Sequence, residues 1–312
     1  MAGDFPLIIE PKRVRDPKVW IASNKAYLDQ ELDRCGAILL RGLGISTEHD
    51  FADLVKAYSA NVAEYLYRST PRTDIGAGVY TSTEYPAGLS ITLHNENAYQ
   101  RDWPLRLFFF CAYPADGGGG QTPLAKMINV TNRIDPSIRA KFAETKVMYI
   151  RNYRKDIDIP WQTVFQTELK AEVEDYCVRH DIDFEWTTPD TLRTKQVCQA
   201  FAKHPRTGAV IWFNSATLFH PSNLDSRSRK ALLSMFSEDD FPRNVKLGDG
   251  APIDEADLDN VRAAFASEMA IFDWRAGDVL VLDNMLTAHG RTPYKGKRRV
   301  LTAMCDLISS YR

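Results

Sequence analysis

Hydrophobic spacing predicts amphipathic helices along much of the chain. In several segments apolar side chains recur at intervals of three and four residues, which places them on one face of a helix. Asp50 is suited to begin another helix, because its side chain can accept a backbone N–H. The predicted helices are Asp16–Arg34, the segment that follows Asp50, Asp135–Ala143, Trp161–Arg179, Leu224–Phe236 and Asp254–Phe265. We expect these helices to pack around the outside of a core.

Short apolar runs predict strands on both sides of the central helical block. The run Leu105–Tyr113 is nearly all apolar, as in a strand that is buried on both faces. The other predicted strands are Ala37–Leu40, Ile91–Asn95, Gln121–Ala125, Gly208–Phe213, Val279–Asp283 and Arg299–Leu307. We therefore expect a single domain over residues 1–312, with core strands in about 91–128 and 271–312 and an insertion of about 129–270. Tyr67–Ser90, rich in glycine and proline, is expected to form a long functional loop.

Composition excludes several classes of protein. The 312 residues include 39 Lys+Arg and 41 Asp+Glu, a formal net charge of −2, so no basic bias favours a nucleic-acid or membrane partner. No apolar run approaches the roughly 18–20 residues of a membrane-spanning helix, and the N-terminus lacks the features of a secretory signal. The five cysteines are widely spaced, which is typical of reduced thiols in a cytoplasmic protein.

The sequence Leu93-His94-Asn95-Glu96-Asn97 is the sharpest local signal of chemistry. In a strand, residues i and i+2 point to the same side, so His94 and Glu96 would project together. One imidazole and one carboxylate make two thirds of the 2-His-1-carboxylate triad that binds non-haem Fe(II). The same pattern also occurs at polar strand edges without a metal.

A second polar segment lies far downstream. A Gly277-Asp278 turn precedes the apolar run Val279–Asp283, and His289 follows shortly after. About ten residues later, Lys297-Arg298-Arg299 opens another apolar strand. A cation at the head of a buried strand is costly unless it is paired, and a carboxylate suits a guanidinium. A solvated basic turn is the alternative interpretation.

Together these segments resemble the taurine/2,4-D dioxygenase superfamily (TauD/TfdA), and within it the SyrP-like branch. The superfamily motif is HxD/E, a distal His and an Arg about ten residues beyond it. The segments that resemble the branch are Val79–Pro86, His94–Gln100, Trp103–Cys111 and Gly119–Ala125. The resemblance implies a mostly β fold with flanking helices, a double-stranded β-helix (jelly-roll) core with a helical insertion that serves as a lid.

The resemblance also implies a cofactor site and its ligands. His94, Glu96 and His289 would bind Fe(II) and form the catalytic centre. Arg299, with help from Thr122, would hold the distal carboxylate of the cosubstrate 2-oxoglutarate, and O2 would be the oxidant. Arg299 is chosen over Arg298 because it directly precedes Val300, and a shift of one residue turns a side chain to the other face of a strand.

Enzymes of the SyrP-like branch are mostly tailoring hydroxylases of natural-product pathways, and some act on amino acids held on carrier proteins. Glu96 favours oxygen transfer over halogenation, since related halogenases have Ala or Gly at this position. We therefore expect hydroxylation of an amino acid or amino-acid derivative. Desaturation or ring closure by the same cofactors is one alternative, and a non-catalytic jelly-roll binding protein is another.

The sequence leaves two forms of the substrate open. Relatives that take free acids often carry another Arg four residues after the 2-oxoglutarate Arg, where this chain has Ala303. The substrate is therefore either masked on a carrier protein or bound by another cation, for which Arg291 and Arg72 are candidates. Further candidate contacts are Asn95, Asn97, Tyr80, Glu84 and Tyr99, although the asparagines could equally close loop hydrogen bonds. We expect His220 to be structural or to line the pocket, and we expect His204 at the surface. Assembly into a homo-oligomer is left open.

Overall fold

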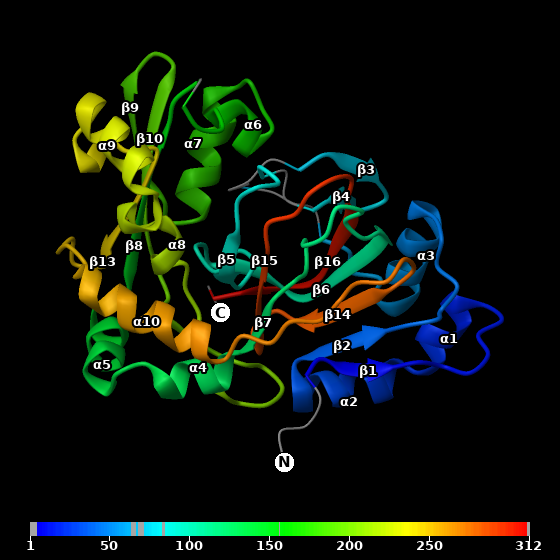
Figure 1. Ribbon diagram of the computed structural model, residues 1–312. Helices are drawn as coiled ribbons and strands as arrows, with labels where there is room; N and C mark the ends of the chain where they lie inside the picture. Colours follow the sequence, from blue (N-terminus) through cyan, green and yellow to red (C-terminus); the bar gives the residue numbers. More distant parts are fainter. Residues whose placement is uncertain (1–4, 64–66, 68–71, 83–84, 156, 311–312) are drawn as a thin grey trace.

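The computed structural model describes residues 5–63, 67, 72–82, 85–155 and 157–310. Two β-sheets face each other in one half of the molecule, and the insertion forms the other half (Figure 1). The small central sheet of β5 (Ile91–His94), β15 (Thr287–Arg291) and β7 (Leu124–Lys126) lies between the large sheet and the insertion. None of the helices in the described part of the chain combines the length and apolarity needed to cross a membrane.

The large sheet contains seven strands among the described residues, and all neighbours are antiparallel except the parallel pair β1–β2. Its central strands are buried on both faces, which explains the nearly continuous apolar run in β6. In spatial order the strands are β1 (Leu7–Ile9), β2 (Ala37–Leu40), β14 (Val279–Asp283), β6 (Asp102–Tyr113), β16 (Arg299–Ser309), β4 (Val79–Thr81) and β3 (Asp74–Gly76).

The small sheet closes the jelly-roll and carries the polar motifs. Its strands, in order, are β5 (Ile91–His94), β15 (Thr287–Arg291) and β7 (Leu124–Lys126). A hydrophobic cluster joins the large sheet to the small one, with Leu280 of β14 and Leu124 of β7 both fully buried in it. The two facing sheets are those of the predicted double-stranded β-helix.

Three helices cover the outer face of the large sheet: α1 (Pro17–Ser23), α2 (Lys25–Cys35) and α3 (Glu48–Tyr58). The predicted helix Asp16–Arg34 is thus two helices that meet at Asn24. In α3, Thr47 and Asp50 form a capping box, so Asp50 acts within the first turn and Thr47 is the cap. Phe51 of α3 stacks on Phe110 of β6 at 5.4 Å between ring centroids, within the cluster that joins these helices to the sheet.

The insertion is less helical than the sequence predicts. It contains a four-stranded antiparallel sheet among the described residues, in the order β13-β8-β10-β9, and a hairpin of β11 and β12. The buried side chains of β10 include the polar residues Thr194 and Gln196. Apolar and polar residues therefore do not alternate regularly along this strand, and the sequence pattern does not predict it. The strands are β8 (Val147–Tyr153), β9 (Asp183–Thr188), β10 (Thr191–Cys198), β11 (Phe201–Lys203), β12 (Val210–Trp212) and β13 (Arg243–Leu247).

Helices surround this second sheet and join it to the jelly-roll. They are α4 (Met127–Arg133), α5 (Pro136–Thr145), α6 (Trp161–Phe165), α7 (Lys170–Arg179), α8 (Ala216–Phe219), α9 (Ser226–Met235) and α10 (Glu255–Ser267), with 3-10 turns η1 (Pro221–Asn223) and η2 (Glu238–Asp240). The predicted helix Trp161–Arg179 is interrupted at Gln166, whose φ of 55° is left-handed. The predicted loop Tyr67–Ser90 contains β3 and β4, and its residues 68–71 and 83–84 lie outside the described part.

Candidate active site

Two adjacent strands of the small sheet bring the predicted metal ligands together. His94 ends β5 and pairs directly with His289 on β15, and their ring centroids are 4.6 Å apart. Gly290 permits this close pairing, because a Cβ atom there would lie 2.6 Å from the carbonyl oxygen of Ile91. One ligand atom from each of His94, Glu96 and His289 fits within 4.8 Å of the others. The arrangement therefore has the donor set and spacing of a 2-His-1-carboxylate site.

The hydrogen bonds of these side chains leave ligand atoms available. His94 Nδ1 lies 2.8 Å from the carbonyl oxygen of Thr92, which leaves Nε2 as the free acceptor. Burial, followed by the neighbouring His94 and Arg72, holds the pKa of His289 well below its ordinary value, so its imidazole is neutral. Its Nε2 lies 3.8 Å from Glu96 Oε2, and its Nδ1 has no hydrogen-bond partner among the described residues. Two imidazoles beside a carboxylate fit Fe(II).

A cationic inner compartment adjoins this cluster. His94, His289, Phe109 and Thr122 line it together with three arginines, Arg72, Arg291 and Arg298, whereas no carboxylate is among its described lining residues. Thr122 accepts a hydrogen bond from Trp274 Nε1 at 3.1 Å, so its own hydroxyl hydrogen remains available to an acceptor. The compartment has a volume of about 40 Å³, and its positive charge favours an anionic group such as a carboxylate.

The structure places Arg298, and not Arg299, in this compartment. Val300 also lines it, and Arg298 immediately precedes β16, whose register shifts between Arg299 and Val300. Arg299 points to the other side, where it pairs with Glu48 of α3. Arg298 Nε donates to the carbonyl oxygen of Gly120 at 2.9 Å, and burial together with Arg291 lowers its pKa to about 10. Arg299 therefore lies outside the compartment that Arg298 lines, and the identity of the arginine that binds 2-oxoglutarate stays a prediction.

The Arg291 side chain is hydrogen-bonded to the loop that precedes β5. Its guanidinium donates to the carbonyl oxygens of Tyr85, Pro86 and Leu89 at 2.9, 2.7 and 2.8 Å. Burial lowers the pKa of Arg291 from its ordinary value. The side chain thus fixes one wall of the cavity, and its position in the inner compartment makes it a poor match for the predicted substrate clamp.

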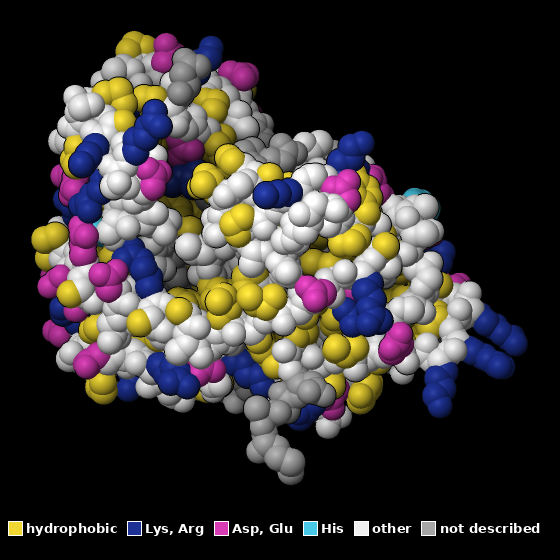
Figure 2. All heavy atoms as spheres, viewed as in Figure 1, with side chains coloured by type: hydrophobic (Ala, Val, Ile, Leu, Met, Phe, Trp, Pro, Cys, Tyr) yellow, Lys and Arg dark blue, Asp and Glu magenta, His cyan; other side chains and the backbone are white. Residues whose placement is uncertain are grey.

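A larger outer cavity of about 470 Å³ lies between the jelly-roll and the insertion. Figure 2 shows the surface hollowed between these two halves. Arg72, Ile91 and His94 line both this cavity and the inner compartment, so the ligand cluster sits at their junction. Arg72 Nη2 donates to Glu96 Oε2 at 2.7 Å, which places Arg72 beside the predicted ligands.

Three other predicted contacts also line the outer cavity, namely Asn95, Asn97 and Tyr99. Asn95 Nδ2 donates to the backbone carbonyl of Asn284 at 2.6 Å and thus closes a loop hydrogen bond. Asn97 has a left-handed φ of 57°, and its buried Oδ1 has no hydrogen-bond partner within the described chain.

Two other predicted contacts are not found among the described residues of the cavity lining. Tyr80 is buried in the cluster between the two sheets and lines neither compartment. Glu84 lies outside the described residues.

Sequence reasoning missed several residues of this site. Asn284 binds both backbone groups of Glu96, and its position one residue after a buried strand was the available signal. Asp158 and Arg243 form an ion pair in the far wall of the outer cavity, where His220 also lies. The insertion supplies both members of the pair, and no motif marks them. His204, expected at the surface, is buried and lies 2.9 Å from Asp283 Oδ2.

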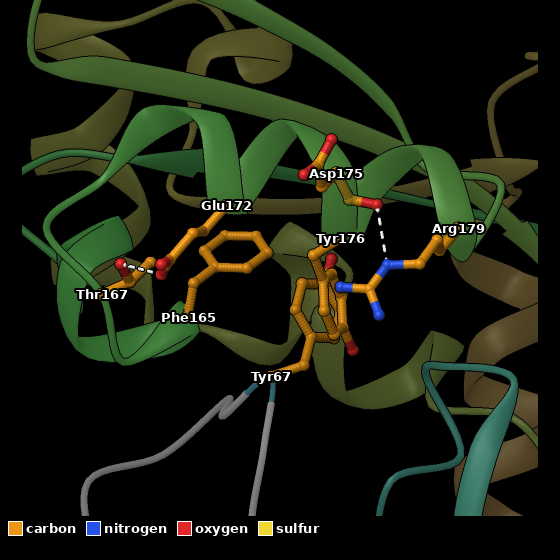
Figure 3. A pocket seen from close by; sticks show the side chains of 7 residues that line it. All are labelled: Tyr67, Phe165, Thr167, Glu172, Asp175, Tyr176 and Arg179. Atoms are coloured by element: carbon orange, nitrogen blue, oxygen red, sulfur yellow. Dashed lines mark hydrogen bonds between the residues drawn. The ribbon is translucent and has the colours of Figure 1, made fainter.

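A further cavity, of about 270 Å³, lies on the insertion beside α6 and α7 (Figure 3). The aromatic rings of Tyr67, Phe165 and Tyr176 line it. Its polar groups are bonded to one another, since Thr167 donates to Glu172 and Arg179 Nε donates to the backbone oxygen of Asp175. It contains none of the predicted site residues, and the candidate active site is therefore the one around His94 and His289.

Comparison with known proteins agrees with this geometry. The family model described as "Taurine catabolism dioxygenase TauD, TfdA family" matches residues 7–305. The chain is 41% identical over 281 residues to the dapdiamide synthesis protein DdaC of Enterobacter agglomerans, covering 90% of this chain and 85% of DdaC. It is 28% identical to a clavaminate synthase-like protein of Arabidopsis thaliana, with 96% and 93% covered.

Solved structures share the fold. PvcB, an Fe, alpha-ketoglutarate dependent oxygenase from an isonitrile synthetic pathway, matches with a TM-score of 0.53 and 15% identity over 96% of this chain and 84% of PvcB. AAD-2, solved with Mn(II) and N-oxalylglycine, matches with a TM-score of 0.55 and 10% identity over 97% and 94%. These matches confirm the predicted jelly-roll. The family match across nearly the whole sequence shows that this chain belongs to the TauD/TfdA family of Fe(II)- and 2-oxoglutarate-dependent dioxygenases.

Proposed function

We propose that the protein hydroxylates an unactivated C–H bond of an amino acid or amino-acid derivative in natural-product biosynthesis. The observation that carries the proposal is the position of His94, Glu96 and His289 at the junction of two compartments. One compartment is lined by three arginines and favours an anionic group such as a carboxylate of the cosubstrate. The other has the volume for a small organic substrate. The name of the relative DdaC, a dapdiamide synthesis protein, supports a biosynthetic role.

Each group has a distinct task in this proposal. His94, Glu96 and His289 would hold Fe(II), Arg298 would bind the distal carboxylate of 2-oxoglutarate, and Thr122 would donate a hydrogen bond to it. When bound, iron and 2-oxoglutarate supply O2 activation, in which 2-oxoglutarate is oxidised to succinate and CO2 while the substrate is oxidised. The protein orients the reactants and excludes water from the junction.

Glu96 favours hydroxylation over halogenation, because a carboxylate occupies the position that a halide would need. Desaturation or ring closure by the same cofactors is the second candidate outcome. A binding protein without catalysis is disfavoured by the cluster of two imidazoles and a carboxylate beside a cationic compartment, which a simple binding role does not require.

The wider setting is also part of the proposal. We infer that residues 1–312 act as one catalytic domain, because buried side chains of the insertion and of the small sheet belong to one hydrophobic cluster. A cytoplasmic location is supported by five free and buried cysteines. Presentation of the substrate on a carrier protein and assembly into a homo-oligomer stay predictions.

The direct test is a mass-spectrometric screen of amino acids and their derivatives with Fe(II), 2-oxoglutarate and ascorbate. A gain of one oxygen atom in the product, coupled to succinate formation, supports hydroxylation. A loss of two hydrogens would support desaturation or ring closure instead. Binding of an amino acid without any consumption of 2-oxoglutarate would support the binding-protein alternative.

A further inference from the structure

A charged pair stands in the wall of the outer cavity that the insertion provides. Arg243 begins β13, and Asp158 precedes α6. The two form a bidentate ion pair, with Arg243 Nε and Nη2 each 2.8 Å from an oxygen of Asp158. Both side chains line the cavity whose opposite wall carries His94 and Glu96.

Arg243 keeps donors for a second partner. A guanidinium has five N–H groups, and the pair with Asp158 uses two of them. The Arg243 side chain is 28% exposed, so the remaining donors are not sealed into the core. Burial raises the pKa of Asp158, but Arg243 and then Arg151 lower it, and the net shift is downward, so Asp158 is held as a carboxylate against Arg243. The unused N–H donors of Arg243 suit a second anionic acceptor such as a carboxylate.

The other arginines near the site contact other groups or lie in the other compartment. Arg291 donates to three backbone carbonyls of the loop at 85–89. Arg72 is bonded to Glu96, and Arg298 lies in the inner compartment. Among the described residues that line the outer cavity, Arg243 is therefore the guanidinium that lies away from the predicted metal ligands.

A second feature of the cavity calls for a hydrogen-bond donor. Asn97 is 6% exposed and lines the cavity, and no group in the described part of the chain donates to its Oδ1. A buried acceptor of this kind is costly unless a ligand or water satisfies it. An N–H group of the substrate is the complementary donor.

We propose that Arg243 binds a free carboxylate of the substrate and that Asn97 accepts a hydrogen bond from a substrate N–H group. The substrate is then a free acid with an amino or amide nitrogen, and Asp158 positions Arg243. A thioester to a carrier protein consumes the α-carboxylate, so a free acid fits this site better than an amino acid that is tethered through that group. The inference rests on the proposed function, because it names the substrate class of the same site.

The test compares matched ligands in the intact enzyme. Standard amino acids and their N-acetyl derivatives are supplied as free acids, as primary carboxamides and as carrier-loaded thioesters, and succinate formation is measured. The wild-type enzyme should prefer a free acid over its carboxamide by about 30-fold in kcat/KM, the size of one charge-assisted interaction. In Arg243→Gln that preference should fall to about threefold through a higher KM for the acid, and Arg243→Lys should be intermediate because it keeps the charge without the planar fork.

Arg229→Gln is the control, because Arg229 also belongs to the insertion but pairs with Glu255 and does not line the cavity. The Arg229→Gln variant should prefer the free acid over the carboxamide as strongly as the wild-type enzyme does. The proposal is overturned if Arg243→Gln and Arg243→Lys keep the full preference, if thioesters react as well as acids, or if no free acid stimulates succinate formation. Failure of the wild-type enzyme to bind Fe(II) and 2-oxoglutarate would instead reject the proposed function.

Discussion

The side-chain amide of Asn284 binds both backbone groups of Glu96. Asn284 Oδ1 accepts from the Glu96 N–H at 2.7 Å, and Asn284 Nδ2 donates to the Glu96 carbonyl at 2.9 Å. The same Nδ2 donates to the carbonyl oxygen of Pro104, and Asn95 Nδ2 donates back to the Asn284 carbonyl. Asn284 follows β14 of the large sheet and is fully buried. The predicted carboxylate ligand is thus held in place from the opposite sheet.

Asn284→Asp should weaken metal binding more than it weakens the fold. The substitution keeps the shape of the side chain but removes the Nδ2 donor to the Glu96 carbonyl. We expect the affinity for Mn(II), measured by calorimetry, to fall about 10–100-fold, as for other groups that orient metal ligands. The matched control is Asn152→Asp, which removes a comparable buried donor to Asp239 and Phe241 in the insertion. Equal Mn(II) affinity in the two variants would contradict a positioning role for Asn284.

The two neighbouring arginines at the head of β16 should differ in their effect on 2-oxoglutarate. Arg298→Lys should raise the Kd for 2-oxoglutarate about tenfold or more, because lysine cannot reproduce the planar fork. Arg299→Lys should change it less than about twofold, since Arg299 contacts Glu48 on the other side of the strand. Equilibrium binding in the presence of Mn(II) measures both. A larger effect of Arg299→Lys would restore the register expected from the sequence.

Metal binding should stabilise the fold through the predicted ligands. At 100 times its Kd, Mn(II) should raise the free energy of unfolding by about 2.7 kcal/mol. In His289→Ala this gain should disappear, while unfolding without metal stays cooperative. Denaturant unfolding with and without Mn(II) gives the comparison. A full gain in the His289→Ala variant would show that the metal binds elsewhere.

A buried charge network next to the site should contribute strongly to stability. Asp283 pairs with Arg106 and His204, and its Oδ1 also accepts from the N–H groups of Met285 and Leu286 just before β15. Asp283→Asn would leave the Arg106 charge without its nearest counter-ion in the core. We expect a loss of about 3–5 kcal/mol in denaturant unfolding. A loss below about 1 kcal/mol would mean that Asp29 and Asp33 compensate Arg106.

The sequence predicts the parts of the site that follow strand periodicity. His94 ends β5 and pairs with His289 on the strand beside it, whereas Glu96 lies in the turn that follows β5, so strand alternation does not place it. Strand periodicity alone does not decide between the arginines, because Arg298 precedes β16 and the register shifts between Arg299 and Val300. The structure itself places Arg298 in the inner compartment. The preference for Arg299 rested on its adjacency to Val300, which in a regular strand means the opposite face.

Residues brought in by tertiary packing could not be predicted in this way. Asp158 and Arg243 are 85 residues apart in the sequence and meet only because the insertion folds around its own sheet. That sheet was missed because polar residues such as Thr194 and Gln196 occupy its buried positions. Asn284 acts on Glu96 across the two sheets of the jelly-roll, a relationship that no local pattern encodes.

The most direct test of the central claim is an anaerobic titration of the Fe(II) enzyme with 2-oxoglutarate, followed by the visible charge-transfer absorption of the chelate. The account predicts that the absorption saturates at one 2-oxoglutarate per chain, is absent in His289→Ala, and needs about tenfold more 2-oxoglutarate in Arg298→Lys. No absorption in the wild-type enzyme, or an unchanged titration in His289→Ala, would contradict the assignment of His94, Glu96 and His289 as the iron site.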